Sequence, residues 1–199
     1  MSASNSWVFG LRAAGVVTAQ ERPTEPERYD RMTMAFHWAT AALVLSLWLI
    51  GQTAESIPRG PARTAYWSLH LLLGFCLIAV LVGRVLWRVF AGRRLPGVGG
   101  APMRFLAAAT HWMLYFTLFA VIGFGIANAI VRGSHFFELF TFPEVIDPAF
   151  KSKIAVLHSL GANLLGLVAA LHASAAVFHH FGLKDDVLKR MLPKWPSVK

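Results

Sequence analysis

Cysteine, acidic residues and charge in general are all scarce in this sequence of 199 residues. Cys76 is the single cysteine, so no disulfide can form within the chain. Charged residues make up 15% of the sequence, where a soluble domain usually carries about 25%. Hydrophobic residues make up 56%, which excludes a disordered chain and disfavours a soluble enzyme. The net charge of +9 is spread over short segments between apolar runs, and this distribution disfavours nucleic-acid binding.

Four long runs contain no charged residue, and each has at least 20 residues: 32–54, 64–83, 105–131 and 154–183. About 20 apolar residues in a helix cross the roughly 30 Å of hydrocarbon in a membrane. A soluble bundle with four buried helices is the alternative. We therefore predict an all-α integral membrane four-helix bundle, with helices at about 32–54, 64–90, 105–131 and 154–182.

Basic residues divide unequally between the two sides of this predicted bundle. The side with both termini carries 14 Lys and Arg, and the other side carries five, which are Arg59, Arg63, Arg132, Lys151 and Lys153. The positive-inside rule then places both termini in the cytoplasm, as in a multi-pass protein of the bacterial inner membrane.

Three segments flank or interrupt the predicted helices. Residues 1–30 are interpreted as a cytoplasmic extension, residues 31–194 as the membrane domain, and residues 195–199 as a tail. The outer loop 134–148 is rich in phenylalanine, so it is predicted to form a short helix on the membrane surface.

Histidine is the ionisable residue that recurs in the apolar runs, where such residues are costly and usually functional. By depth, His37 and His172 lie near the cytoplasmic side, and His70 and His158 lie near the outer side. His172 follows His158 by 14 residues, which is about 21 Å of rise and about 40° short of four full turns. Both rings therefore lie on nearly one face of the fourth helix, at two depths.

Two depth-matched histidine pairs are what bis-imidazole ligation of two haems requires. A zinc site would instead gather three or four ligands about 2.0–2.3 Å from one ion. A covalently attached haem would need Cys-x-x-Cys-His, which a chain with one cysteine cannot supply. Gly74, one turn from His70, and Gly161, near His158, would let a flat macrocycle approach, although ordinary membrane packing also favours glycine. A non-redox bundle with structural histidines is the alternative.

The order of these residues resembles that of a known family. The first helix contains Phe36-His37-Trp38, and the fourth helix runs into Phe178-His179-His180-Phe181-x2-Lys184-Asp185-x3-Leu188-x-Arg190-Met191-Leu192-Pro193. Over about residues 28–194 the sequence resembles the bacterial cytochrome b561 family, four-helix membrane cytochromes with two b-type haems that include superoxide oxidase.

The resemblance implies that His37 and His172 ligate the inner haem b, and that His70 and His158 ligate the outer one. It also implies electron transfer from periplasmic superoxide through both haems to ubiquinone near the cytoplasmic side. Members of the wider group serve as membrane anchors for periplasmic dehydrogenases or hydrogenases, so a relay subunit between the quinone pool and a periplasmic redox partner is the alternative. The implied partners are membrane lipid, ubiquinone, and superoxide or that redox partner.

Four further residues carry open interpretations. Arg84 follows His70 by 14 residues, so it would pair with a haem propionate at inner depth or extend to lipid phosphate. His179 and His180 would contact quinone oxygens or haem propionates, or simply lie at the interface. His111 competes with His37 for the inner iron, although the family order favours His37. Its other role would be a hydrogen bond to a propionate or to Tyr115, four residues further on.

Overall fold

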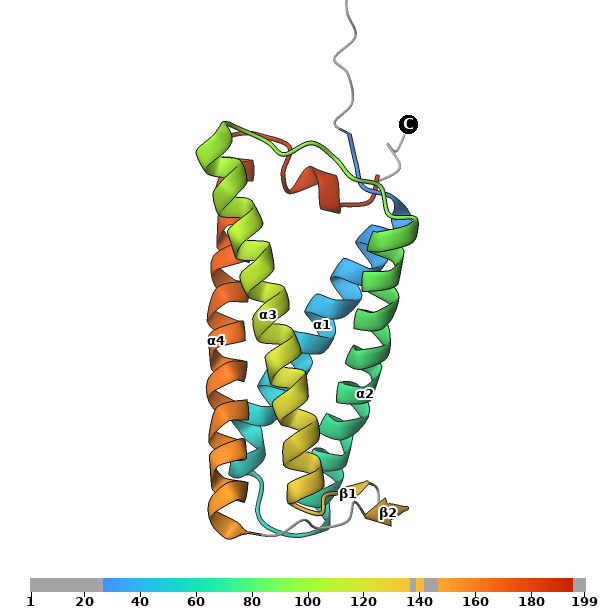
Figure 1. Cartoon of the computed structure of the whole chain (residues 1–199), viewed down its shortest axis with the longest axis vertical. Coiled ribbons are helices and arrows are strands. Elements are labelled where there is room, and N and C mark those ends of the chain that lie inside the picture. The colour runs from blue at the N-terminus through green and yellow to red at the C-terminus, as the bar shows by residue number, and fades with distance from the viewer. Residues whose placement is uncertain (1–26, 137–138, 142–146, 195–199) are drawn as a thin grey trace, which may run out of the picture.

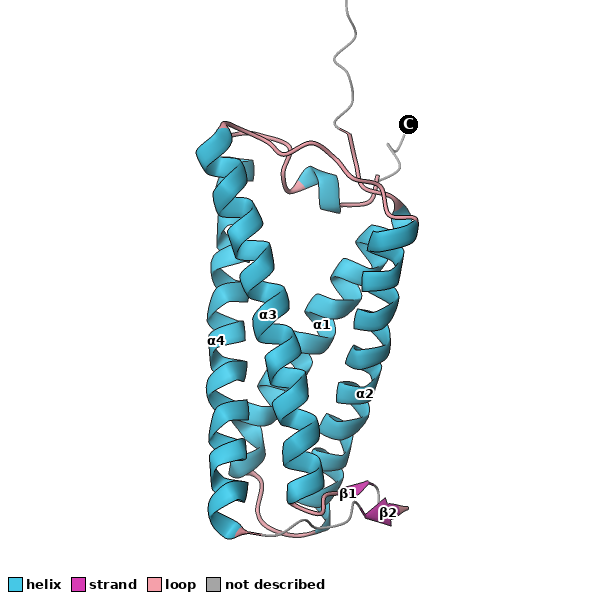
Figure 2. Cartoon of the chain, in the orientation of Figure 1, coloured by secondary structure: helices cyan, strands magenta, loops and turns pink. Residues whose placement is uncertain are grey.

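Four long helices form the protein in a computed structural model that describes residues 27–136, 139–141 and 147–194 (Figures 1 and 2). They are α1 (Arg31–Thr53), α2 (Pro61–Phe90), α3 (Ala101–Val131) and α4 (Pro148–Phe181), with 3-10 turns at Ala54–Ser56 and Lys189–Met191. Each of the four is long and apolar enough to cross a membrane. The predicted all-α membrane bundle is therefore confirmed, whereas most of the predicted extension (1–26) and the tail (195–199) lie outside the described residues.

Three helices, α2, α3 and α4, begin three or more residues before their uncharged runs, because local start signals precede those runs. A proline lies in the first turn of each of α2, α3 and α4, where its missing N–H leaves no helical hydrogen bond unmade. The side chain of Asp147 caps α4 by accepting a hydrogen bond from the Ala149 backbone N–H at 3.0 Å. Arg104, Lys151 and Lys153 consequently lie inside helices. With 34 residues, α4 is about 51 Å long and exceeds the hydrocarbon thickness.

The phenylalanine-rich outer loop forms a small antiparallel ladder, so the predicted surface helix is wrong for the residues described there. Strand β1 (His135–Phe136) pairs with β2 (Phe140–Thr141). The Leu139 N–H donates to the Phe136 carbonyl at 2.9 Å and closes the turn between the strands. The Phe136 ring packs on Phe75 of α2 with 6.2 Å between ring centres, which holds the ladder against the bundle. Residues 137–138 and 142–146 lie outside the described part.

The four helices are arranged as two closely packed pairs. Helix α1 packs along α2, and α3 packs along α4, whereas contacts between the pairs are few (Figure 1). The described ends of the chain and the α2–α3 connection lie at one end of the bundle, which we call the inner end. The β-ladder lies at the opposite end, which we call the outer end. A group held between the pairs would be contacted from both sides.

Buried leucines from three helices join the pairs at mid-height. The cluster consists of Leu77 and Leu81 of α2, Leu118 of α3 and Leu165 of α4. Leu77 follows His70 by seven residues, and Leu165 lies seven residues from both His158 and His172. The cluster therefore forms an apolar layer between the two depths at which the histidines lie. In a bilayer, such packing stabilises a bundle through van der Waals contact rather than through exclusion of water.

The segment after α4 folds back across the inner end. The Trp38 indole N–H donates to the Met191 carbonyl at 2.8 Å, and the Arg28 guanidinium donates to the Leu192 carbonyl at 2.6 Å. The Arg190 guanidinium donates to the Pro96 carbonyl at 2.6 Å. These bonds tie the C-terminal segment to the start of α1 and to the α2–α3 connection.

Asp30 fixes the start of α1 against the end of α2. Its carboxylate accepts hydrogen bonds from the Thr33 backbone N–H at 2.8 Å and the Thr33 hydroxyl at 2.6 Å. It also accepts from the Trp87 indole at 3.0 Å and the Arg93 backbone N–H at 3.1 Å. Partial burial acts to raise the pKa of Asp30, but these hydrogen bonds outweigh it and lower the pKa from 3.8 to about 2.

Replacing Asp30 with alanine is expected to lower the free energy of unfolding by about 1–2 kcal/mol, because the N-cap acceptor is lost. The folded-state pKa lies below the unfolded value, so the carboxylate stabilises the fold above about pH 4 and stops doing so as the pH falls through about 2. Thermal unfolding in detergent across this pH range measures both effects. Asp30→Asn keeps an acceptor and is the control: it should retain most of the stability and lose the acid dependence. Equal melting temperatures for wild type and Asp30→Ala would contradict the expectation.

Candidate functional site

Seven-residue steps along each helix place residues at three levels of the bundle. The rows are His37, Val44 and Gly51 in α1; Arg84, Leu77 and His70 in α2; His111, Leu118 and Gly125 in α3; and His172, Leu165 and His158 in α4. Seven residues turn a helix by about 700°, close to two full turns, so each row lies on nearly one face. The middle members belong to or pack against the leucine cluster. We call the level of His37 and His172 the inner level and that of His70 and His158 the outer level.

Each level contains one histidine pair that bridges the two helix pairs. At the inner level the His37 and His172 ring centres are 6.3 Å apart. At the outer level the His70 and His158 ring centres are 6.2 Å apart. Helix α4 thus contributes one ring to each level, facing α1 at one and α2 at the other.

These spacings fit one metal ion between each pair of rings. A metal–imidazole bond is about 2.0 Å long and the ligating nitrogen lies about 1.1 Å from its ring centre, so two axial imidazoles have centres about 6.2 Å apart. The His111 and His172 ring centres are 5.2 Å apart, which is too close for an ion on the line between them. The geometry therefore favours His37 over His111 as the partner of His172.

The His158 ring is oriented by α3. Its Nδ1 lies 3.0 Å from the Val121 carbonyl oxygen, which can only accept, so Nδ1 carries the proton and leaves the Nε2 lone pair free for a metal. A Cβ at Gly125 would lie 3.0 Å from Cε1 of the same ring, so glycine permits this close approach. Neither residue was predicted from the sequence. The glycine within an apolar run was the only available signal, because the carbonyl contact spans 37 positions.

Open space lies on the face of α2 that carries His70, one turn along the helix. A Cβ built on Gly74, one turn from His70, would meet no neighbouring atom within 4 Å, and the same holds for Gly51 of α1. Gly161 differs, because a Cβ there would lie 3.0 Å from Val121 Cγ2, so this glycine serves the packing of α4 on α3. The spacing of the rings, the free Nε2 of His158 and this space together fit a haem.

Arg84 projects into the bundle at the inner level. One guanidinium nitrogen lies 3.4 Å from His37 Nδ1, and the guanidinium carbon lies 5.5 Å from the centre of the Tyr115 ring. The side chain is half-buried beside the inner histidines. This position favours pairing with an anionic group inside the bundle over extension to lipid phosphate.

At the inner end, His179 forms a hydrogen bond with Asp185 that was not predicted from the sequence. Its Nδ1 lies 2.5 Å from Asp185 Oδ2, and the Val187 backbone N–H donates to the other carboxylate oxygen at 3.1 Å. Lys184 adopts a left-handed φ of 54°, which turns the chain back toward the helix. Partial burial acts to raise the pKa of Asp185, but the hydrogen bonds from His179 and Val187 lower it overall. His180 Nδ1 is buried and has no hydrogen-bond partner among the described residues.

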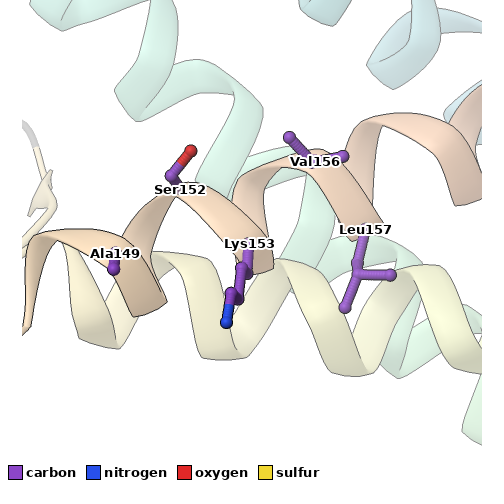
Figure 3. Close-up of a pocket in the computed structure, with 5 residues that line it drawn as sticks. All are labelled: Ala149, Ser152, Lys153, Val156 and Leu157. Carbon is purple, nitrogen blue, oxygen red and sulfur yellow. The ribbon is translucent and has the colours of Figure 1, made fainter.

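The basic residues of the outer end do not converge on a second site within the described part of the chain. Arg63 is held by Glu55 at 3.3 Å and by the Ile57 carbonyl, and Arg132 donates to the Asn128 side chain at 3.0 Å. A shallow hollow on the outer half of α4 is lined by Ala149, Ser152, Lys153, Val156 and Leu157 (Figure 3). It lies on the surface of one helix and includes none of the histidines, so it is not the functional site.

The arrangement fits the class of helical membrane proteins that hold haem between paired histidines. Comparison with known proteins agrees with this class: the family model described as prokaryotic cytochrome b561 matches residues 28–194. Cytochrome b561 homolog 2 of Escherichia coli (strain K12) is 36% identical over 179 residues, covering 86% of this chain and 95% of that protein. A probable superoxide oxidase CybB of Yersinia pestis is 31% identical over 182 residues, covering 84% and 97%. Cytochrome b562 of Cereibacter sphaeroides is 29% identical over 175 residues, covering 85% and 98%.

The chain belongs to the prokaryotic cytochrome b561 family. It is therefore a multi-pass bacterial membrane protein of electron transport that binds b-type haem. The family predicted from the sequence is confirmed.

Proposed function

We propose that this protein holds two b-type haems and acts as a superoxide:ubiquinone oxidoreductase. The observation that carries the proposal is the presence of two histidine pairs, one at each level, with ring centres 6.3 and 6.2 Å apart. The similarity to a probable superoxide oxidase supports the choice of electron donor. When bound, the two haems would supply a one-electron relay between the two sides of the membrane.

Four histidines and one arginine would hold these groups. His37 and His172 are the proposed inner ligands, and His70 and His158 are the proposed outer ligands. Arg84, beside His37, is the proposed partner of a haem propionate, because a guanidinium pairs well with a carboxylate. Each pair would supply two imidazole nitrogens to its haem iron, so the chain would leave no coordination position for a substrate.

At the outer end the proposed reaction needs no acid–base group of the chain. Two superoxide anions each give up one electron and leave as O2, with no bond to break and no proton to move. The described outer level contains the two histidines proposed as ligands and two glycines, and no acid–base pair.

At the inner end the proposed reaction needs protons, because ubiquinone takes up two protons and two electrons to form the quinol. Asp185 holds the Nδ1 proton of His179, which leaves Nε2 as the nitrogen that can face a quinone oxygen. A histidine can exchange protons near neutral pH. His180, whose buried Nδ1 has no partner among the described residues, is the second proposed quinone contact.

We also propose that the inner end faces the cytoplasm. The described basic residues that flank the bundle at its two chain ends and in the α2–α3 connection lie at this end, and the positive-inside rule orients such a protein accordingly. Reporter fusions after Lys199 and within residues 97–101 should read as cytoplasmic, and fusions within 134–148 as external. An external C-terminus would contradict this orientation, because the inner level would then lie near the external side and the outer level near the cytoplasm.

Stopped-flow spectroscopy tests the function and its inner site together. Superoxide should reduce both haems of the wild type, and added ubiquinone should reoxidise them. His179→Ala and His180→Ala should leave the reduction by superoxide intact. His179→Ala should slow the reoxidation about 100-fold, because a general acid–base group typically contributes at least that factor. Asp185→Asn should slow it less, because the amide keeps an acceptor for His179.

A matched control lies one position further on. Asp186 pairs with Lys189 at 2.9 Å on an exposed surface, so Asp186→Asn should leave the reoxidation unchanged. Wild-type reoxidation in the single variants and in the His179/His180 double variant would remove these residues from the quinone site. If superoxide does not reduce the intact protein, the relay-subunit function is favoured instead.

A further inference from the structure

A third histidine lies at the inner level, and neither metal ligation nor a contact to Tyr115 accounts for it. The ring centre of His111, on α3, is 5.2 Å from that of His172. Tyr115 lies instead under the Arg84 guanidinium. Because His111 is too close to His172 for a metal between them, its position calls for another role.

The proton of neutral His111 can be assigned. Its Nδ1 lies 2.6 Å from the Ala107 carbonyl oxygen of its own helix, and a carbonyl can only accept. Nδ1 therefore carries the hydrogen, and Nε2 presents a lone pair. The Nε2 atom of His111 can therefore accept one hydrogen bond from a group outside its own helix.

His172 needs such an acceptor. If its Nε2 binds a metal, its Nδ1 carries a hydrogen, and a metal-bound histidine almost always donates that hydrogen to a neighbouring acceptor. His158 does so to the Val121 carbonyl at the outer level. For His172, the described residues provide no hydrogen-bond partner of this kind, and the ring nearest to it is that of His111.

The distance between the His111 and His172 ring centres matches that expected for a hydrogen bond between the two rings. An N–H hydrogen bond spans about 2.9 Å and each nitrogen lies about 1.1 Å from its ring centre, so two bonded imidazoles have centres about 5.1 Å apart. The observed separation is 5.2 Å.

We propose that His111 is the positioning residue of His172: it accepts the Nδ1 hydrogen of His172 on its own Nε2, while its Nδ1 hydrogen stays on the Ala107 carbonyl. This inference rests on the proposed axial role of His172. The two rings then form a chain of hydrogen bonds that leads from the inner metal to the backbone of α3. The inner level uses an imidazole where the outer level uses the Val121 carbonyl.

The bond has a measurable consequence for the inner haem. An acceptor on the far nitrogen makes a ligating imidazole more basic, which favours ferric over ferrous iron. Loss of the acceptor should weaken this preference about tenfold, which for a one-electron couple is a rise of about 59 mV in midpoint potential. The outer haem should not respond, because its ligands do not contact His111.

Redox titration and electron paramagnetic resonance of the purified holoprotein test the proposal. His111→Ala should raise the inner midpoint potential and change the low-spin ferric signal of the inner haem, while the outer haem stays as in the wild type. His111→Gln, whose amide oxygen can accept the same hydrogen, should restore most of both properties. Tyr115→Phe, which keeps the ring under Arg84, is the control and should match the wild type.

Three outcomes would overturn the proposal. The first is an unchanged inner potential and an unchanged signal in His111→Ala. The second is loss of the inner haem in both His111 variants with retention in His37→Ala, because His111 would then be the ligand. The third is a wild-type protein without an inner haem, and only this result also removes the proposed inner haem itself. If His111→Ala binds too little haem to titrate, retention of the haem by His111→Gln with near wild-type potential still supports the acceptor role.

Discussion

Replacing His70 or His158 with alanine is expected to remove the outer haem and to leave the inner haem bound. Replacing His37 or His172 should do the reverse. The reason is geometric: each pair bridges the two helix pairs at its own level, with ring centres about 6.2–6.3 Å apart, and the leucine cluster separates the levels. A low-spin haem that loses one of two axial imidazoles loses much of its binding free energy.

The haem content of each purified variant and its reduced-minus-oxidised spectrum measure this expectation. His180→Ala is a suitable control, because His180 lies beyond both levels and should retain two haems. The single substitutions also separate the two candidates at the inner level. If His37→Ala keeps both haems while His111→Ala loses one, the assignment of the inner ligand is wrong.

Filling the open space beside His70 should remove the outer haem without touching a ligand. Gly74→Leu places a branched side chain on the face of α2 that carries His70, where no neighbouring atom lies within 4 Å of a built Cβ. The side chain would occupy the volume that the macrocycle needs. We expect the outer haem to be lost, with the inner haem and membrane insertion retained.

Gly74→Ala is the matched control, because a single methyl group fits the same space and should leave both haems bound. Gly51→Leu provides an independent test from α1, at the same level. Two bound haems in both leucine variants would show that this space does not hold the macrocycle.

Periodicity within one helix follows from the sequence alone. The 14-residue interval from His158 to His172 determines a face and two depths on its own, because rise and rotation per residue are properties of the helix. Counting from the ends of the runs also matched His70 to His158 and His37 to His172, and the structure places these rings close together. The first residues of the helices were harder to predict from the sequence. Charge-free runs mark the part of a helix that lies in the hydrocarbon, and helices such as α4 extend beyond it.

Contacts between helices required the tertiary structure. The Val121 carbonyl that orients His158 and the closeness of His111 to His172 depend on how far each helix is rotated about its axis and how it crosses its neighbour. The pairing of Asp185 with His179 depends on the turn at Lys184. None of these contacts leaves a periodic pattern in the sequence from which it could be predicted.

The sequence by itself determined the four membrane helices, the family and the two depths at which histidines lie, because apolar length and helical repeat are local properties of the chain. Only the tertiary structure decided that the helices pack as two pairs with the rings between them, which backbone groups hold those rings, and which histidine of the inner level faces His172 across a metal-sized gap. Those features depend on side-chain packing between segments far apart in the chain, and the distance from ring to ring distinguishes a ligand from its neighbour.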